Sequence, residues 1–180
     1  ISNFYVSENS VLETLGAGAF SNCQNLVYFG PETTKQYTSE NSAFISPKSL
    51  KTIGDSAFIN IKFKSFDIQT GSVLETIEAS AFSNSSISQI NFPATLTSIG
   101  ARAFEKASIE TAPNIPSDNN INNVDSEAFL STPWFNNSER IIFANTLLVD
   151  RREGITDLVI EEGVKYIANS VYNVSPSKST

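Results

Sequence analysis

The sequence predicts a solenoid, an α/β superhelix in which one chain winds into a single curved stack of about six coils. Three observations predict this fold class. The dipeptide Ala-Phe occurs six times, five of these copies share two aliphatic residues upstream, and the middle copies are almost evenly spaced. A length of 180 residues fits one elongated array as well as one ordinary domain. We therefore treat residues 1–180 as a single solenoid domain.

The repeat consists of a phenylalanine preceded directly by alanine, with aliphatic residues five and eight places before the phenylalanine. With 14 Ala and 13 Phe in 180 residues, chance gives roughly one Ala-Phe pair, so the excess indicates a repeat. The five full copies are Leu12/Leu15/Ala19/Phe20, Leu50/Ile53/Ala57/Phe58, Leu74/Ile77/Ala81/Phe82, Leu96/Ile99/Ala103/Phe104 and Ile121/Val124/Ala128/Phe129. A sixth, degenerate copy is Val164/Ile167/Val171/Tyr172.

The spacing of the copies predicts two insertions. From Phe20 to Tyr172, successive aromatic residues of the repeat lie 38, 24, 22, 25 and 43 residues apart. The three middle values give a unit of 22–25 residues, inside the range of leucine-rich-repeat coils. The outer values place insertions at 30–41 and 134–154. The remaining pair, Ala43-Phe44, lacks the upstream aliphatic residues, and we expect it in the strand that precedes a repeat.

The copy at 87–104 indicates what each coil does. Alternation predicts a strand that Pro93 ends, because proline has no N–H for the ladder. Its expected inward side chains are Ile87, Ile90 and Phe92, and its outward ones are Ser88, Gln89 and Asn91. A second extended stretch at 96–99 and a tight helical turn follow. There, Ala103 is small because neighbouring coils approach closely, and Phe104 fills the interior, where a buried ring contributes ~1.5–3 kcal/mol.

Charge and missing residue types exclude several classes of protein. The 12 Lys plus Arg and 19 Asp plus Glu give a net charge of −7, which argues against a nucleic-acid or anionic-membrane partner. The chain has no histidine, which removes the commonest general base and most transition-metal ligands. No apolar run approaches the roughly 18 residues of a membrane span, so we predict no membrane insertion of this segment.

The single cysteine, Cys23, excludes an intrachain disulfide. A disulfide between chains is one alternative, but we expect Cys23 to be buried as a small hydrophobe. The sequence starts at Ile1 without an initiator Met or a basic signal peptide, and it contains no Met. We therefore expect an excised segment or a processed product, from which an export signal or an anchor is missing.

At this point the pattern L-x-x-I-G-x-x-A-F-x-x-C/S resembles the BspA-like leucine-rich repeats, from about Val11 to Tyr172. The match is closest at 50–58 and 96–104, and Cys23 stands at the cysteine position usual in that family. The other copies depart from it with Ile61, Ser85, Ala107 and Thr132. The resemblance implies a leucine-rich-repeat solenoid, mostly short β-strands with short helical turns. It also implies a surface-exposed or secreted bacterial or protist protein used for adhesion.

The late insertion resembles a β-hairpin that interrupts the array in such proteins. Residues 140–143 and 146–149 read as its strands, with Ala144-Asn145 at the turn. The predicted organisation is therefore repeats at about 11–133, an inserted hairpin at about 134–154 and a last repeat at about 155–174.

The outward strand face is the most plausible binding surface, because a solenoid presents one long, rigid, repeated face. The candidate binding residues on that face are Tyr28, Lys62, Lys64, Asp67, Gln89 and Asn91. A solvated sheet face that binds nothing is the alternative. Trp134 and Phe135 are possible anchors of hot-spot type, although we prefer a role in covering the apolar interior where the hairpin leaves the array.

No catalytic residue, cofactor or metal site is predicted. Serine is abundant, but G-x-S-x-G is absent and no histidine is present to activate a hydroxyl. Residues 118–120 offer oxygen ligands without the spacing of an EF-hand loop, and a polar linker explains them. We expect non-catalytic recognition or adhesion at a cell surface, with a host or matrix protein or a cell-surface glycan as partner. The alternative is a structural spacer within a larger surface protein, with no ligand of its own.

Overall fold

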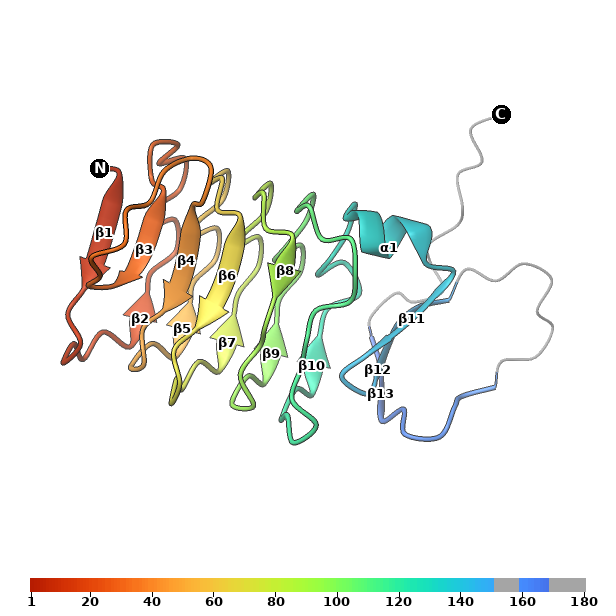
Figure 1. The fold of residues 1–180 in the computed structure, drawn as a ribbon. Coiled ribbons are helices and arrows are strands. Elements are labelled where there is room, and N and C mark those ends of the chain that lie inside the picture. The colour runs from red at the N-terminus through yellow and green to blue at the C-terminus, as the bar shows by residue number, and fades with distance from the viewer. Residues whose placement is uncertain (151–158, 169–180) are drawn as a thin grey trace, which may run out of the picture.

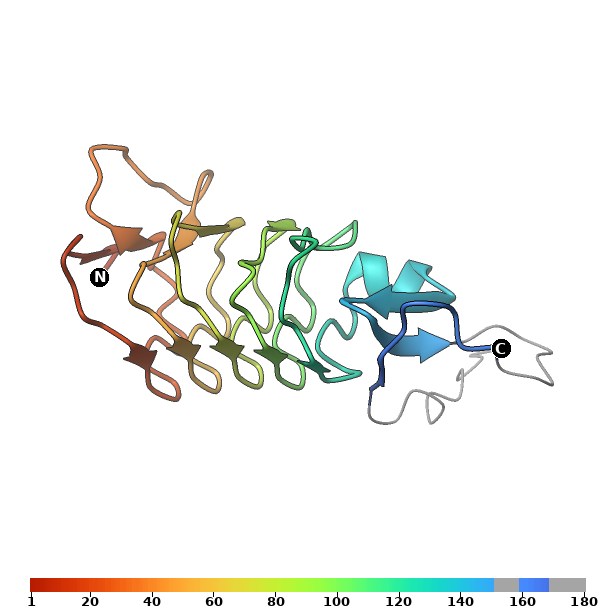
Figure 2. The same ribbon diagram turned by 90° about the horizontal axis from the view of Figure 1, so that it is seen from below.

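The computed structural model describes residues 1–150 and 159–168, and it shows the predicted solenoid (Figure 1). Two five-stranded parallel sheets form opposite walls, which Figure 2 shows edge-on. Sheet A has the order β1 (Asn3–Val6), β3 (Tyr28–Pro31), β4 (Ala43–Ser46), β6 (Ser65–Ile68), β8 (Gln89–Ile90). Sheet B has the order β10 (Asn123–Val124), β9 (Ser98–Ile99), β7 (Thr76–Ile77), β5 (Thr52–Ile53), β2 (Thr14–Leu15).

The side chains of each coil divide as the sequence predicts. The inward set of the copy at 87–104 is buried, namely Ile87, Ile90 and Phe92. The outward set, namely Ser88, Gln89 and Asn91, is exposed. In sheet B each strand repeats a polar residue and then a buried aliphatic one, as in Thr52-Ile53 beside Thr76-Ile77. This alternation gives a solenoid with one continuous apolar interior.

The interior contains two columns of phenylalanine rings. The turn column consists of the repeat phenylalanines Phe20, Phe58, Phe82, Phe104 and Phe129. Its neighbours are stacked with ring centroids 5.3–5.6 Å apart and planes within 16° of parallel. The strand column, which the sequence did not predict, consists of Phe4, Phe29, Phe44 and Phe66, with centroids 5.1–5.4 Å apart. Phe44 lies in β4, as predicted, and meets Phe58 edge-to-face at 5.2 Å.

The Ala-Phe segments form hydrogen-bonded turns and not the predicted helical turns. Around Phe58, every second N–H bonds within its own coil, and the intervening N–H groups donate to the next coil, as in Phe58 N–H to Ala81 O at 2.9 Å. A helix would use all these donors internally. Each full turn also contains left-handed non-glycine residues, such as Asn60 with φ 65°. The turns therefore join the coils edge to edge.

Repeat glycines mark places where coils come too close for a side chain. A Cβ at Gly54 would lie 2.5 Å from Leu15 O, and one at Gly100 would lie 2.7 Å from Ala79 N. At Gly16, in the first coil, a Cβ would meet nothing within 4 Å. The same repeat position is thus constrained inside the stack and free at its end.

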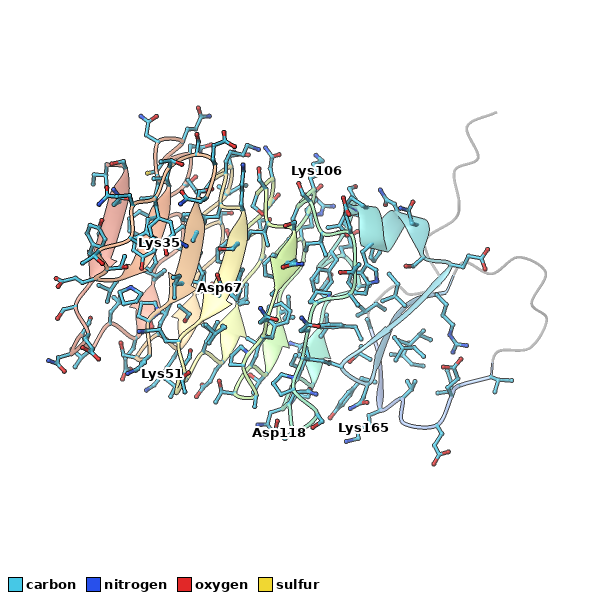
Figure 3. All side chains as sticks on the ribbon, in the orientation of Figure 1. Lys35, Lys51, Asp67, Lys106, Asp118 and Lys165 are labelled. Atoms are coloured by element: carbon cyan, nitrogen blue, oxygen red, sulfur yellow. The ribbon has the colours of Figure 1, made fainter. Side chains whose placement is uncertain are left out.

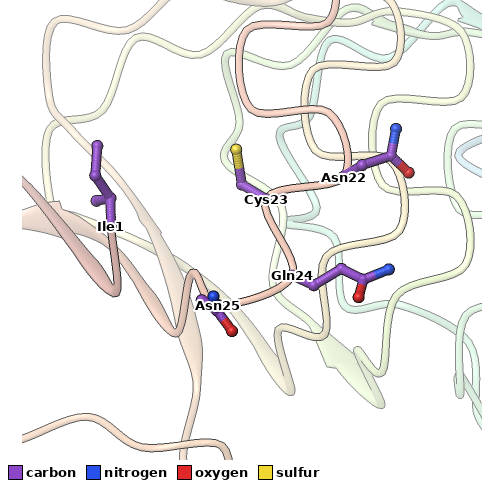
Figure 4. Close-up of a pocket in the computed structure, with 5 residues that line it drawn as sticks. All are labelled: Ile1, Asn22, Cys23, Gln24 and Asn25. Atoms are coloured by element: carbon purple, nitrogen blue, oxygen red, sulfur yellow. The ribbon is translucent and has the colours of Figure 1, made fainter.

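The expectation that Cys23 is buried is wrong, because its side chain is exposed. The matching residues of later coils are buried, among them Ile61 and Thr132. Among the described residues, no coil stacks on the outer side of the first one, so nothing covers Cys23. A hollow of about 410 Å³ lies there, and Figure 4 shows Ile1 and Cys23 on its opposite sides.

The early insertion is a loop on the outer side of sheet A. Residues 32–42 leave β3 and return directly to β4, which pairs with β3 in parallel (Tyr28 with Ala43, Phe29 with Phe44). The loop stands off the sheet in Figure 2.

The late insertion contains the predicted hairpin of β11 (Arg140–Phe143) and β12 (Thr146–Asp150). Its turn residues Ala144 and Asn145 have φ of 49° and 61°, as a two-residue hairpin loop requires. A short helix that the sequence did not predict, α1 (Pro133–Asn137), precedes it. The strand β13 (Tyr166–Ile167) of the last repeat pairs in parallel with β12. Val171, Tyr172 and residues 151–158 lie outside the described residues.

Strand pairing is interrupted between the array and the hairpin. In the described part of the chain β10 is the last strand of sheet B, and β12 belongs to the separate sheet β11-β12-β13. The gap, which we call the seam, holds a cavity of about 110 Å³ lined by Asn122–Val124, Thr146 and Tyr166–Ala168. The backbone N–H of Trp134 donates to Ile109 O at 2.8 Å, and aromatic contacts join the two parts.

Candidate functional site

The outer face of sheet A carries a patch of polar side chains over β6 and β8. We call Ser65, Asp67, Gln89, Asn91 and Asn114 the polar patch. Ser65 pairs with Gln89, and Asn91 pairs with Asn114, so these side chains lie on neighbouring strand positions. Asp67 lies in front of β6 in Figure 3. The residues are exposed or partly exposed. Three of the predicted binding residues, Asp67, Gln89 and Asn91, therefore come together here.

The hydrogen-bonding groups of the patch are largely unused. Asn114 donates to the side-chain oxygen of Asn91 at 2.9 Å. Among the described residues, Asp67 and Gln89 make no side-chain hydrogen bond or ion pair. Some polar groups just before the sheet B strands are paired, since Lys51 pairs with Glu13 at 3.0 Å and the Thr97 hydroxyl donates to Glu75 O. Asp67 and Gln89 are therefore open to hydrogen bonding with a ligand.

Tyr28 is not available as a binding residue, which corrects the prediction. Its side chain is fully buried although it lies on the outward side of β3. The ring of Tyr37, from the loop at 32–42, stacks on it with centroids 4.1 Å apart, and Tyr5 contacts it at 5.6 Å. Its hydroxyl donates to Pro31 O at 2.7 Å. Burial, and then the neighbouring Tyr37 and Tyr5, raise the pKa of the Tyr28 hydroxyl above its ordinary range.

Lys62 and Lys64 precede β6 and do not lie in the centre of the face. Lys64 pairs with Glu40 of the loop at 3.1 Å, at the edge of sheet A. Lys62 lies on the turn edge, where its ammonium donates to the backbone oxygen of Asn84 at 2.8 Å. The predicted strand register therefore holds for Asp67, Gln89 and Asn91 but not for Lys62.

The two possible anchors cover the interior. Phe135 is 2% exposed, so it is not accessible to a ligand. Trp134 is half-buried, and its ring meets Phe129 at 5.2 Å and Phe143 at 5.9 Å. Both therefore close the apolar interior where α1 replaces a strand of sheet A. This is the covering role that the sequence analysis preferred for them.

A row of asparagines along the turn edge was missed by the sequence analysis. Asn84 donates to the side-chain oxygen of Asn60 at 2.8 Å, and Asn60 donates to that of Asn22 at 2.7 Å. We call these three residues the asparagine ladder. All have φ near 60°, a conformation that asparagine adopts more readily than most residues. Their shared position, two residues after each phenylalanine, is visible in the aligned repeats.

Among the described residues, no three His, Cys, Asp or Glu side chains come together as metal ligands. No helix formed by residues 1–150 and 159–168 combines the length and apolar composition of a membrane span. Several acidic side chains of the described part form exposed ion pairs with Lys or Arg of a neighbouring coil.

A stack of coils with a buried aliphatic residue in each sheet B strand and an Ala-Phe turn after it defines a leucine-rich-repeat protein. A family model described as a BspA-type leucine-rich repeat region matches residues 33–147 with six copies. The chain belongs to this family, whose members are generally non-catalytic and typically surface-associated. Neither the curated proteins nor the solved structures gave a match.

Proposed function

We propose that this repeat module recognises an extracellular ligand at a cell surface, without catalysis, through the polar patch of sheet A. The ligand class is a host or matrix protein or a cell-surface glycan. The observation that supports the proposal is the free hydrogen-bonding capacity of Asp67 and Gln89 on a rigid parallel sheet. The sheet fixes the backbone positions of these side chains before binding, which limits the conformational entropy lost when a ligand arrives.

The neighbouring surface limits where such a ligand lies. Toward β1, the loop at 32–42 covers Tyr28, and Lys64 holds that loop through Glu40. Toward the hairpin, the strand face continues through Asn114. A ligand on the patch therefore contacts β6, β8 and Asn114, with the loop as a side wall.

The test is a binding screen of the purified chain against immobilised matrix proteins and glycans. Any ligand found is then measured with Gln89→Glu and Asn91→Asp, which add negative charge to the patch. We expect each to weaken binding about tenfold or more, because a buried polar contact is lost or opposed by charge. Thr76→Glu, on the outer face of sheet B, is the matched control and should bind normally.

Far-UV circular dichroism of each variant separates loss of binding from loss of fold. If no matrix protein, glycan or cell surface binds the folded chain, the structural-spacer function is correct and the polar patch is a solvated surface. Equal weakening by Thr76→Glu and Gln89→Glu would place the ligand elsewhere.

A further inference from the structure

A second surface feature, on the turn edge beside the asparagine ladder, has the properties of a ligand site. An open hollow of about 500 Å³ is lined there by Gln24, Asn60, Lys62 and Asn84. It adjoins the hollow beside Cys23, since Gln24 lines both. The hollow is open to solvent, and all four lining side chains carry hydrogen-bonding groups.

The ladder fixes the orientation of the carboxamides in the hollow. Asn60 donates one N–H to Asn22 and accepts one hydrogen bond from Asn84. A carboxamide has two N–H donors and two acceptor lone pairs, so each ladder residue keeps a donor or an acceptor for another partner. No side-chain hydrogen bond of Gln24 occurs among the described residues. The hollow therefore offers paired donors and acceptors, the pattern that sugar hydroxyls match.

Lys62 supplies a cation that has no acidic partner within residues 1–150 and 159–168. In the part of the chain that the structure describes, its ammonium hydrogen-bonds only to Asn84, at 2.8 Å to the backbone oxygen and 3.3 Å to the side-chain oxygen. Lys48, Lys51, Lys64, Arg102 and Lys106 each sit within 4.0 Å of a carboxylate, whereas Lys35 and Lys165, like Lys62, have no such partner among the described residues. Two contacts leave one ammonium N–H for a further acceptor. In a chain of net charge −7, Lys62 is thus directed by Asn84 at a hollow without a lining carboxylate.

We propose that this hollow binds a carboxylate-bearing sugar, such as a uronic or sialic acid unit of a glycan. Lys62 receives the carboxylate, and Asn60, Asn84 and Gln24 bond the hydroxyl groups. The site is separate from the polar patch and does not depend on the function proposed for it. A charge-assisted hydrogen bond fixes one end of the sugar, and the carboxamides select for hydroxyls at the other.

The first test compares three probes by chemical-shift changes in the full chain. Glucuronate should shift the amide signals of Asn60, Lys62 and Asn84 with a dissociation constant of about 1 mM, a free energy of roughly −4 kcal/mol. Glucose, which lacks the carboxylate, and acetate, which lacks the hydroxyls, should bind at least about tenfold more weakly. Equal binding of acetate would refute sugar recognition, and equal binding of glucose would refute the role of Lys62. The absence of glucuronate-dependent shifts would overturn the site.

The second test uses matched variants. Lys62→Gln should weaken glucuronate binding about tenfold, whereas Lys48→Gln, which changes the net charge equally at a distant coil edge, should not. Asn60→Asp keeps a residue that tolerates the left-handed conformation and adds a carboxylate, so it should abolish binding in a folded chain. Similar affinities for Lys62→Gln and the unaltered chain would overturn the proposal.

Discussion

Removal of Phe82 tests the energetic importance of the two phenylalanine columns. Phe82 is fully buried and lies in the turn column between Phe58 and Phe104, at 5.3 and 5.5 Å. It also meets Phe44 and Phe66 of the strand column edge-to-face, at 5.1 and 5.2 Å. Phe82→Ala removes all four ring contacts at once.

The expected loss follows from this packing. A buried Phe→Ala change costs ~3–5 kcal/mol, and the cost is high where the surroundings do not collapse into the cavity. Here the neighbouring rings belong to coils whose spacing is fixed by backbone hydrogen bonds, such as Phe82 N–H to Ala103 O at 2.7 Å. The coils therefore cannot move together to fill the cavity. We therefore expect a fall of about 4 kcal/mol in the free energy of unfolding. Phe20→Ala, in the half-buried ring of the first coil, should cost only about 1–2 kcal/mol.

Equilibrium unfolding in urea measures both variants. Far-UV circular dichroism follows the whole array, and the fluorescence of Trp134, the only tryptophan, follows the seam end. Coincident transitions allow the two free energies to be compared. A loss below about 1 kcal/mol for Phe82→Ala would show that the ring does not fill the space between coils.

Three further outcomes are expected. Gly54→Ala should lower the free energy of unfolding in urea by about 2 kcal/mol, because its Cβ would lie 2.5 Å from Leu15 O. Gly16→Ala should change it by less than about 0.5 kcal/mol, and equal effects of the two variants would contradict the close approach of the coils at Gly54. Burial raises the pKa of Tyr28 in the folded state, so the stability that it contributes is complete below its unfolded pKa of 10.0 and falls as pH rises beyond it. Urea melts between pH 9 and 11.5, roughly spanning that range, should show a shallower decline for Tyr28→Phe, and an unchanged decline would reject this assignment. Ala144→Gly should stabilise the hairpin by about 0.5–1 kcal/mol because Ala144 has φ 49°, measured by Trp134 fluorescence in urea; a loss of stability would show that the methyl group matters more.

Most of the array was predictable because a periodic interior repeats one chemical pattern. The presence or absence of the upstream aliphatic pair correctly distinguished Phe58, which lies in a turn, from Phe44, which lies in β4. The strand column was missed because its members share no neighbouring dipeptide. The helix α1 had a readable signal, since Thr132 caps it by accepting from Phe135 N–H at 3.1 Å and Pro133 follows at its first position.

The site was harder to predict, since exposure depends on segments outside the repeat. Tyr28 has the alternation of an outward residue, but only the path of the loop at 32–42 decides that Tyr37 covers it. Cys23 occupies a repeat position that is buried in later coils, but it is exposed because its coil is the first of the described stack. Asp67 and Gln89 were placed correctly because their exposure depends on strand alternation alone.

The seam gives the molecule an uneven resistance to mechanical force. Neighbouring coils are joined by strand pairing in both sheets, by turn hydrogen bonds and by two ring columns. Across the seam the described residues form the Trp134 N–H bond to Ile109 and contacts among the rings of Phe92, Phe129, Trp134 and Phe143. Tension applied through the chain after Ala168 would therefore open the seam first and leave the polar patch and the asparagine ladder in coils that still hold their shape. The coils and the hairpin would thus separate at this junction before the coils themselves unfold.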